Sequence, residues 1–231
     1  MTNDALVLAV DDDAAVRTAL ARILRSAGYA VETFPGARQL LARLPTVTVP
    51  CCVVTDLRMP GMDGLALQEE LCAGGAPALV FLTGYADVPT TLRVMKRGAV
   101  DVLQKPVGAD ALVAAVDAAL RRACEEAATR DLVQHDRVRY VTLTPRERQV
   151  FALVTAGLLN KQVGYELGTS EKTVKVQRAR VMEKMGARSL PDLVRMADRL
   201  GVGAAGGAAP AWAGVHPVYP APVAADAHPA G

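Results

Sequence analysis

Hydrophobic positions in the first 125 residues follow two alternating patterns. Short apolar runs have the length of buried β-strands, and they lie at 5–10, 31–34, 51–56, 78–83 and 100–104. Between them, apolar residues recur at helical spacing. The first of these helical segments follows the strand at 5–10 and ends before Gly28, and the others occupy 37–44, 64–72, 87–97 and 109–128. Five strands alternating with five helices predict an α/β fold, a doubly wound five-stranded parallel sheet in a domain of residues 1–125.

The pattern changes after this domain. Residues 129–143 are polar and irregular, so we predict a linker over 126–143. A helix then opens at Thr144, with proline and glutamate at the spacing of a capping box. Helical stretches near 160–167, 171–185 and 190–200 complete a predicted small all-α, four-helix domain over 144–200. Residues 201–231 are mostly Ala, Gly and Pro with little charge, which predicts a disordered tail.

Charge is distributed unevenly between the two domains. Residues 1–130 carry 13 Lys and Arg against 15 Asp and Glu, whereas residues 144–200 carry 11 against 6. A compact basic part favours a nucleic-acid partner for the second domain. The first residues lack the basic start of a leader, and no apolar run approaches the length of a membrane span. We therefore expect a cytoplasmic protein without a membrane partner.

Polar side chains stand at the ends of four predicted strands. They are Asp11 and Asp12, Asp56, Thr83, and Lys105. Because parallel strands end at the same edge of a sheet, the carboxylates would repel each other unless a cation lay among them. Mg²⁺ prefers such oxygen ligands, and Lys105 and Thr83 would face the oxygens of a phosphoryl group. The pattern therefore predicts phosphoryl transfer onto Asp56 as the nucleophile.

Each of these residues also has a simpler interpretation. Asp56 could cap a turn, and the triplet Asp11–Asp13 could cap a helix. Thr83 could be an ordinary strand-end hydroxyl, and Lys105 a solvated surface charge. One such coincidence is common, but coincidences at four strand ends favour a functional site.

These residues and their neighbours resemble the receiver domain of two-component response regulators, which has a flavodoxin-like sheet. The matching motifs within residues 5–125 are Val10–Asp13, Thr55–Pro60, Asp63-Gly64, Leu82–Gly84 and Lys105-Pro106. The resemblance implies that Asp56 accepts the phosphoryl group. It also implies that Mg²⁺ is bound directly by Asp12, Asp56 and the backbone carbonyl of Arg58, and that Asp11 acts partly through water.

One position departs from the receiver pattern. The resemblance implies that Lys105 and Thr83 contact the phosphoryl group. It also implies that Thr83 moves toward this group and that the residue three positions before Lys105 follows the movement of Thr83. This residue is aromatic in many receivers, but here it is Val102. An aromatic rotamer switch is therefore unavailable, and the route of the signal to the helix at 87–97 stays open.

The predicted helix at 171–185 has an apolar and a basic face. At 100° per residue, one side collects Val174, Val181 and Met185, and the other collects Lys172, Lys175, Val176 and Ala179, flanked by Thr173 and Arg180. Ser170 is a good N-cap. This could be an ordinary solvated helix face. The preceding helix and the short turn at 168–170 instead favour a helix-turn-helix, whose second helix can lie in a DNA major groove.

The second domain resembles the LuxR-type DNA-binding domain, and the two domains together are similar to FixJ-type regulators. The matching motifs are Thr144–Arg148, Gly157, Asn160-Lys161, Glu166–Gly168, Lys172–Lys175 and Met182–Met185. By this resemblance, the expected base contacts are Lys175 and Val176, and the expected phosphate contacts are Lys161, Thr173 and Arg180. Ser170 and Lys172 complete the expected DNA-binding residues. Gly164 stands where alanine is common, and it should cost the supporting helix about 1 kcal/mol relative to Ala.

We hypothesise a response regulator, not an enzyme, that is phosphorylated by a sensor histidine kinase. Phosphorylation would favour a homodimer that binds promoter DNA, works with RNA polymerase and activates transcription. One alternative is a phosphohydrolase with Asp11 as nucleophile and Asp13 as acid, but it needs a late acidic cluster where this chain has Lys-Pro. The other is a flavin-binding domain, whose phosphate would be repelled by three aspartates.

Overall fold

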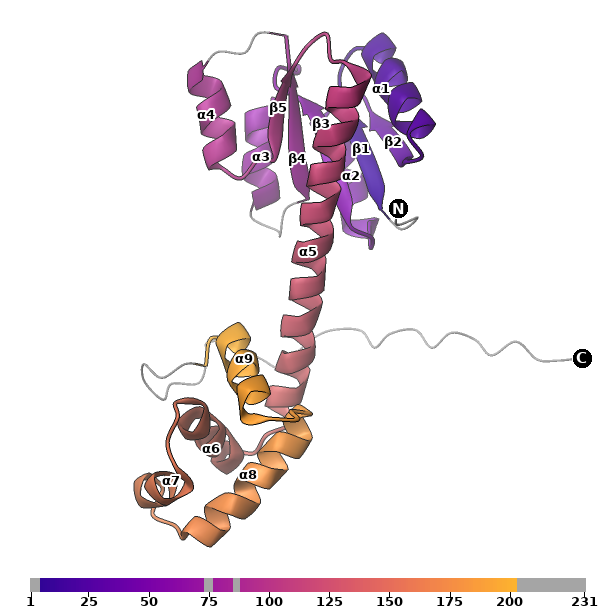
Figure 1. The fold of residues 1–231 in the computed structure, drawn as a ribbon. Coiled ribbons are helices and arrows are strands. Elements are labelled where there is room, and N and C mark those ends of the chain that lie inside the picture. The colour runs from indigo at the N-terminus through magenta and orange to yellow at the C-terminus, as the bar shows by residue number, and fades with distance from the viewer. Residues whose placement is uncertain (1–4, 73–76, 85–87, 203–231) are drawn as a thin grey trace, which may run out of the picture. The chain divides into compact units, whose positions relative to one another are not determined.

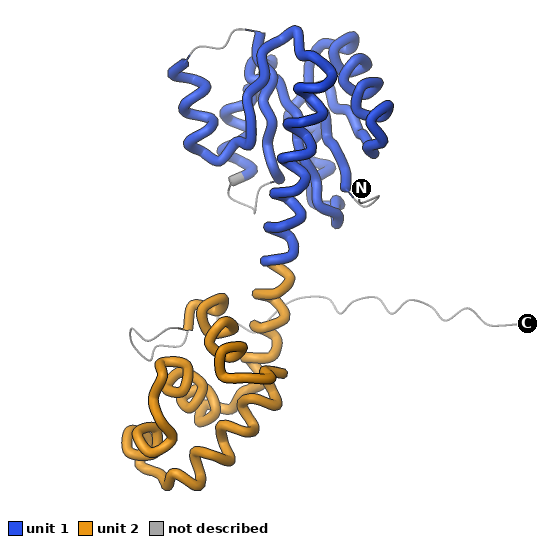
Figure 2. Tube along the Cα trace, viewed as in Figure 1, with its two compact units in different colours: residues 1–129 blue, residues 130–231 orange. Residues whose placement is uncertain are grey.

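The computed structural model describes residues 5–72, 77–84 and 88–202. The chain divides into two compact units, residues 1–129 and 130–231, which Figure 2 colours separately. The tail predicted to be disordered lies outside the described residues from position 203 onward. Among the helices that are described, none combines the length and the hydrophobicity needed to cross a membrane.

The first unit contains a parallel sheet in the order β2-β1-β3-β4-β5 (Figure 1). Its strands are β1 (Leu6–Val10), β2 (Ala30–Phe34), β3 (Cys51–Asp56), β4 (Ala78–Thr83) and β5 (Asp101–Gln104). Its helices are α1 (Ala14–Ser26), α2 (Ala37–Arg43) with the 3₁₀ turn η1 (Leu44–Thr46), α3 (Gly64–Cys72), α4 (Val88–Lys96) and α5 (Ala109–Val141). The predicted doubly wound α/β fold is confirmed, and the predicted strand ends are correct to within one residue.

The sheet is buried on both faces because its strands point apolar side chains alternately toward two helical layers. The core against α1 and α5 contains Val7, Val54, Leu82, Leu24 and Val116. The core on the other face contains Leu8, Val53, Phe81, Leu40, Leu67 and Val94. This double burial fixes the positions of the strand ends.

The register brings four strand ends to one edge. Val10 pairs with Thr55, and Asp56 pairs with Leu82. Strand β1 lies between β2 and β3, so the winding of the chain reverses between β1 and β3. Such a reversal leaves a crevice beyond the carboxyl ends of the two strands, where α/β sheets bind their ligands. Asp56 therefore ends a strand at the most favourable place for chemistry.

In its described residues, 130–202, the second unit consists of the last turns of α5 and four further helices. These are α6 (Pro145–Thr155), α7 (Asn160–Glu166), α8 (Glu171–Met185) and α9 (Leu190–Leu200). The predicted capping box is present, because Thr144 Oγ1 accepts from Glu147 N–H at 3.3 Å and the Glu147 carboxylate accepts from Thr144 N–H at 2.8 Å. Ser170 caps α8 as predicted by accepting from Thr173 N–H at 3.1 Å.

The prediction of an irregular linker over 129–143 is wrong, because α5 continues as a helix to Val141. Its last turns pack into the second unit, where the buried Tyr140 ring meets Phe151 edge-on with centroids 5.3 Å apart. Asp136 is also buried and forms an ion pair with Arg199 at 2.6 Å. The segment contains no Gly or Pro that would end a helix. The polar composition of this segment does not indicate an exposed linker, because one of its polar residues, Asp136, is buried with an ion-pair partner.

A fragment that begins at residue 144 should therefore fold less stably than one that begins at residue 130. The shorter fragment lacks the Tyr140 ring, and loss of a large buried aromatic side chain costs about 3–5 kcal/mol. Urea unfolding of fragments 130–202 and 144–202, followed by circular dichroism, measures the difference. Tyr140→Ala in the longer fragment should reproduce most of the loss, whereas Val138→Ala at an exposed position should not. Equal free energies of unfolding for both fragments would show that α5 contributes nothing.

Candidate functional site

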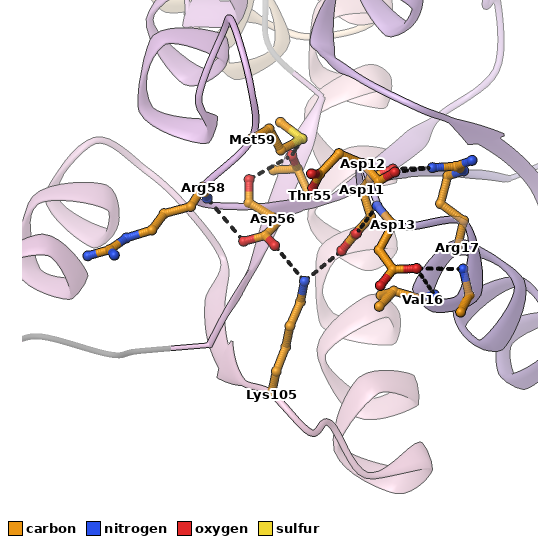
Figure 3. A network of polar contacts seen from close by, with 11 residues as sticks. Asp11, Asp12, Asp13, Val16, Arg17, Thr55, Asp56, Arg58, Met59 and Lys105 are labelled. Atoms are coloured by element: carbon orange, nitrogen blue, oxygen red, sulfur yellow. Dashed lines mark hydrogen bonds and ion pairs between the residues drawn. The ribbon is translucent and has the colours of Figure 1, made fainter.

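Two carboxylates and one ammonium group meet at the sheet edge beyond β1, β3 and β5 (Figure 3). Lys105 Nζ lies 2.6 Å from Asp11 Oδ2 and 2.5 Å from Asp56 Oδ2. The Asp11 side chain is 1% exposed and that of Asp56 is 14% exposed. Carboxylates this far removed from water are costly unless they are paired. Residues from three separate strand ends thus form one charge cluster.

Backbone groups orient both carboxylates. Asp56 Oδ1 accepts from Arg58 N–H at 3.0 Å, and Asp11 Oδ1 accepts from Asp13 N–H at 2.9 Å. In each carboxylate, one oxygen is therefore held by the loop after the strand while the other faces the ammonium group. Asp13 itself caps α1 by accepting from Ala15 N–H at 2.7 Å. The simpler interpretation as a helix cap is thus correct for Asp13, whereas Asp11 points into the site.

The charge of Lys105 is set by two opposing effects. Burial acts to lower its pKa, but hydrogen bonds and charge attraction from Asp11 and Asp56 raise it, and the net pKa lies above the ordinary lysine value. The ammonium group therefore stays charged at neutral pH and balances part of the carboxylate charge. This rules out the interpretation of Lys105 as a solvated surface charge without a partner.

The three predicted metal-binding carboxylates gather at this place. Oxygen atoms of Asp11, Asp12 and Asp56 lie within 4.8 Å of one another. They are hard donors, and Mg²⁺ typically takes one or two carboxylates from a protein while it keeps several waters. The donor set therefore fits a magnesium ion, and the exposed Asp12 leaves one side of it open to solvent. Arg58, whose carbonyl oxygen is the remaining predicted ligand, follows Asp56 in the same loop.

Thr83 and Val102 lie on the neighbouring strands β4 and β5. Thr83 is buried, and its backbone carbonyl accepts from Lys105 N–H at 2.8 Å, which ties together the ends of the two strands. Val102 is half-buried, pairs with Phe81 in the register, and packs against the core cluster that includes Val94 of α4. The register partner of Val102 on β4 is thus an aromatic residue, Phe81, whose side chain lies in this cluster.

Gly64 has a role at the site that the sequence interpretation missed. A Cβ atom at this position would lie 2.6 Å from the Asp56 carbonyl oxygen and 3.0 Å from Phe81 Cε1. Only glycine lets α3 begin this close to the end of β3. The preceding Asp63 accepts from Ala66 N–H at 2.8 Å and so marks the start of the helix. That signal is visible in the sequence, but the crowding behind it is not.

Helix α8 presents the predicted apolar and basic faces. Its buried residues are Val174, Val181 and Met185, each at most 1% exposed. The side chains predicted to contact DNA are all exposed, namely Lys172, Thr173, Lys175, Val176 and Arg180 on α8, Ser170 before it, and Lys161 on α7. They share the surface of one domain, which is the placement that a DNA-binding role requires.

The turn before α8 packs closely against α7. A Cβ atom on Gly164 would lie 2.8 Å from the Thr169 carbonyl oxygen. This glycine, expected only to cost helix stability, therefore also makes room for the turn. Arg178 Nη1 donates to Asn160 Oδ1 at 3.2 Å, which joins α8 to the start of α7. The unit thus contains a helix-turn-helix with α8 as its exposed second helix.

Comparison with known families agrees with both parts of the chain. Residues 7–117 match the response regulator receiver domain, and residues 141–197 match the bacterial regulatory proteins of the luxR family. The chain belongs to the response regulators that join a receiver domain to a luxR-type DNA-binding domain, and it is a two-component transcription regulator. The phosphohydrolase and flavin-binding alternatives are left without support.

Its relatives include the FixJ proteins, as the sequence predicted. The transcriptional regulatory protein FixJ of Azorhizobium caulinodans is 46% identical over 87% of this chain and 95% of its own length. Nodulation protein W of Bradyrhizobium diazoefficiens is 44% identical over 87% of this chain and 88% of its own. The structure of the response regulator StyR aligns with a TM-score of 0.72 at 42% identity, over 85% of this chain and 99% of its own. Full-length FixJ from B. japonicum aligns with a TM-score of 0.52 at 42% identity, over 87% and 98%.

Replacing Gly64 with Ala should destabilise the first unit, because the added methyl group must displace the Asp56 carbonyl or the Phe81 ring. Overpacking of this kind costs about 1–3 kcal/mol. Thermal unfolding of the full chain measures the loss. Gly84→Ala is the matched control, since it also follows a strand but its Cβ would meet nothing within 4 Å. A Gly64→Ala midpoint no lower than that of the control would remove the crowding argument.

Proposed function

We propose that Asp56 accepts a phosphoryl group from a sensor histidine kinase and that its phosphorylation controls DNA binding by the second unit. The observation that carries this proposal is the shared contact of Asp11 and Asp56 with Lys105. One ammonium group contacts two carboxylates from different strands at a sheet edge, which places a carboxylate nucleophile beside a cation that can stabilise the charge on a phosphoryl group.

Transfer begins when a carboxylate oxygen of Asp56 attacks the phosphorus of the kinase's phosphohistidine. As the P–O bond forms, the P–N bond breaks and its electron pair returns to the imidazole, so that an aspartyl phosphate results. Lys105, already in contact with Asp56, stabilises the negative charge on the phosphoryl oxygens. The Thr83 hydroxyl supplies a second contact, and the Arg58 N–H keeps the carboxylate oriented.

Magnesium would be held by Asp12, Asp56 and the Arg58 carbonyl, with Asp11 acting partly through water. When bound, the ion offsets the negative charge of the carboxylates and of the phosphoryl group. The chain itself keeps the ligands in place through backbone donors, since Asp13 N–H holds Asp11 and Arg58 N–H holds Asp56.

The signal leaves the site through apolar packing. Thr83 moves toward the phosphoryl group, and Val102 on the adjacent strand follows it. Because Val102 packs in one cluster with Phe81 and Val94, its movement repacks the contact between the sheet and α4. No aromatic residue at position 102 is needed for this route.

The phosphorylated chain forms a homodimer that binds two half-sites in promoter DNA, works with RNA polymerase and activates transcription. Helix α8 lies in the major groove with Lys175 and Val176 against the bases. The phosphate contacts are Lys161, Thr173 and Arg180, and Ser170 and Lys172 complete the DNA-binding surface. The exposure of all these side chains supports this assignment.

Incubation with acetyl phosphate and Mg²⁺ should add one acid-stable, base-labile phosphoryl group, detected by intact-protein mass spectrometry. Asp56→Asn should abolish the gain, because an amide is not a nucleophile for phosphorus. Asp13→Asn is the matched control, since asparagine is an equally good helix cap and the site carboxylates remain. An Asp56→Asn protein that still gained the group would refute the assignment.

Replacing Lys175 with Ala should reduce sequence-selective DNA binding by about 1–3 kcal/mol, because a base contact is lost. Replacing Lys161 should instead weaken binding to all sequences and lower the salt slope by about one. Fluorescence anisotropy with a selected site and a scrambled site, at several salt concentrations, separates the two effects. Arg195→Ala on α9 is the charge-matched control, since it removes an exposed cation away from α8. Unchanged selectivity in the Lys175 variant would remove it from the readout.

A further inference from the structure

Arg17 lies beside the acidic loop, although neither the sequence motifs nor the proposed transfer use it. We infer that Arg17 is a positioning residue for the Mg²⁺ site, which holds the loop Asp11–Asp13 in the shape that presents its carboxylates to a divalent cation. The inference rests on the proposed function, because it concerns the ion that these carboxylates would bind.

Three successive carbonyl groups of the loop accept hydrogen bonds from this one residue. Arg17 Nη1 donates to the carbonyl oxygens of Asp11 at 2.7 Å and Asp12 at 2.9 Å. The backbone N–H of Arg17 donates to the Asp13 carbonyl at 3.0 Å. The peptide groups between β1 and α1 are therefore fixed at consecutive positions by a single side chain and its own backbone.

The geometry follows from the position of Arg17 on α1. Asp13 is the N-cap of this helix, and helical side chains lean toward the N-terminus of their helix. A long side chain one turn inside the helix therefore reaches back over the loop that precedes it. In the view of Figure 3, the guanidinium group and the cluster of Asp56 and Lys105 lie on opposite sides of the loop. Arg17 contacts the loop backbone and leaves its carboxylates to the site.

The loop needs such support because it carries three adjacent acidic side chains. Their mutual repulsion favours conformations that spread them apart, whereas a metal site needs two of them directed to one point. Asp13 is directed away by its helix cap, and Asp11 is held by Asp13 N–H. Asp12 is exposed, and the bond from Arg17 to its carbonyl fixes the backbone from which its carboxylate extends.

A positioning role and a purely electrostatic role of Arg17 predict opposite effects of its removal on the Mg²⁺ affinity. If Arg17 acted only as a nearby positive charge, it would repel Mg²⁺, and its removal would tighten binding. If it positions the loop, its removal weakens binding. Partners that orient metal ligands typically change metal affinity by about ten- to a hundredfold when they are replaced. The sign of the effect therefore decides between the two roles.

The test is a titration of the full chain with MgCl₂, followed by amide NMR shifts of residues 11–13 and 56–58. Arg17→Met removes the charge and the donors but keeps an aliphatic side chain, and it should raise the Mg²⁺ dissociation constant about tenfold or more. Arg17→Lys keeps the charge, but its ammonium nitrogen lies one bond closer to the backbone than Nη1, the atom that donates to both carbonyls, and it should weaken binding severalfold. Arg22→Met, at an exposed position of the same helix, is the control and should bind like the wild type.

Tighter binding by Arg17→Met, or affinity equal to that of the wild type, would overturn the inference. Thermal unfolding without Mg²⁺ shows whether each variant is folded. If Arg17→Met does not fold, the test rests on Arg17→Lys, and an Mg²⁺ affinity of that variant equal to the wild type overturns the inference. If the loop amides of the wild-type chain do not respond to Mg²⁺, the metal site of the proposed function is refuted, and the inference is refuted with it. If the wild type responds and the Arg17 variants bind Mg²⁺ with the same affinity, only the inference is refuted.

Discussion

The parallel register of the sheet is the constraint on which the first unit depends. Because β1, β3, β4 and β5 end at one edge, the acidic residues that follow β1 and end β3 are forced to be neighbours. Their repulsion cannot be relieved by moving the strands, since both faces of the sheet are packed against helices. The relief has to come from a cation and from backbone donors, and the loops after β1, β3 and β5 are arranged to supply them.

The second unit depends on different physics. Its helices are short, so most of their stability comes from a shared apolar core and from caps at their ends. Two buried carboxylates there have ion-pair partners, Asp136 with Arg199 and Glu147 with Lys184. With the apolar core formed on its inner face, the outer face of α8 can carry residues that serve a partner. Helix α5 contributes side chains to the cores of both units.

Much of this arrangement could be predicted from the sequence. The sequence predicts strands such as 78–83, because a short apolar run of that length is typical of a buried strand. It predicts that Asp56 and Lys105 lie together, because parallel strands end at the same edge of the sheet. The helical course of 129–141 was missed, because local polarity does not reveal that Asp136 is buried against α9. Gly64, Gly164 and Arg17 were missed as well, because each acts on backbone atoms brought close by the fold. The pattern of side chains along a sequence does not show which backbone carbonyl groups the fold brings close to a given residue.

Lys105 brings the acidic site a cation of its own. A magnesium ion bound there, as the proposed function requires, would meet carboxylates that already have a counter-charge. Its binding would then be a competition between a tethered monovalent cation and a mobile divalent one for the same oxygens. Such competition would lower the affinity for the mobile ion, so that occupancy of the site would follow the free magnesium concentration around the protein.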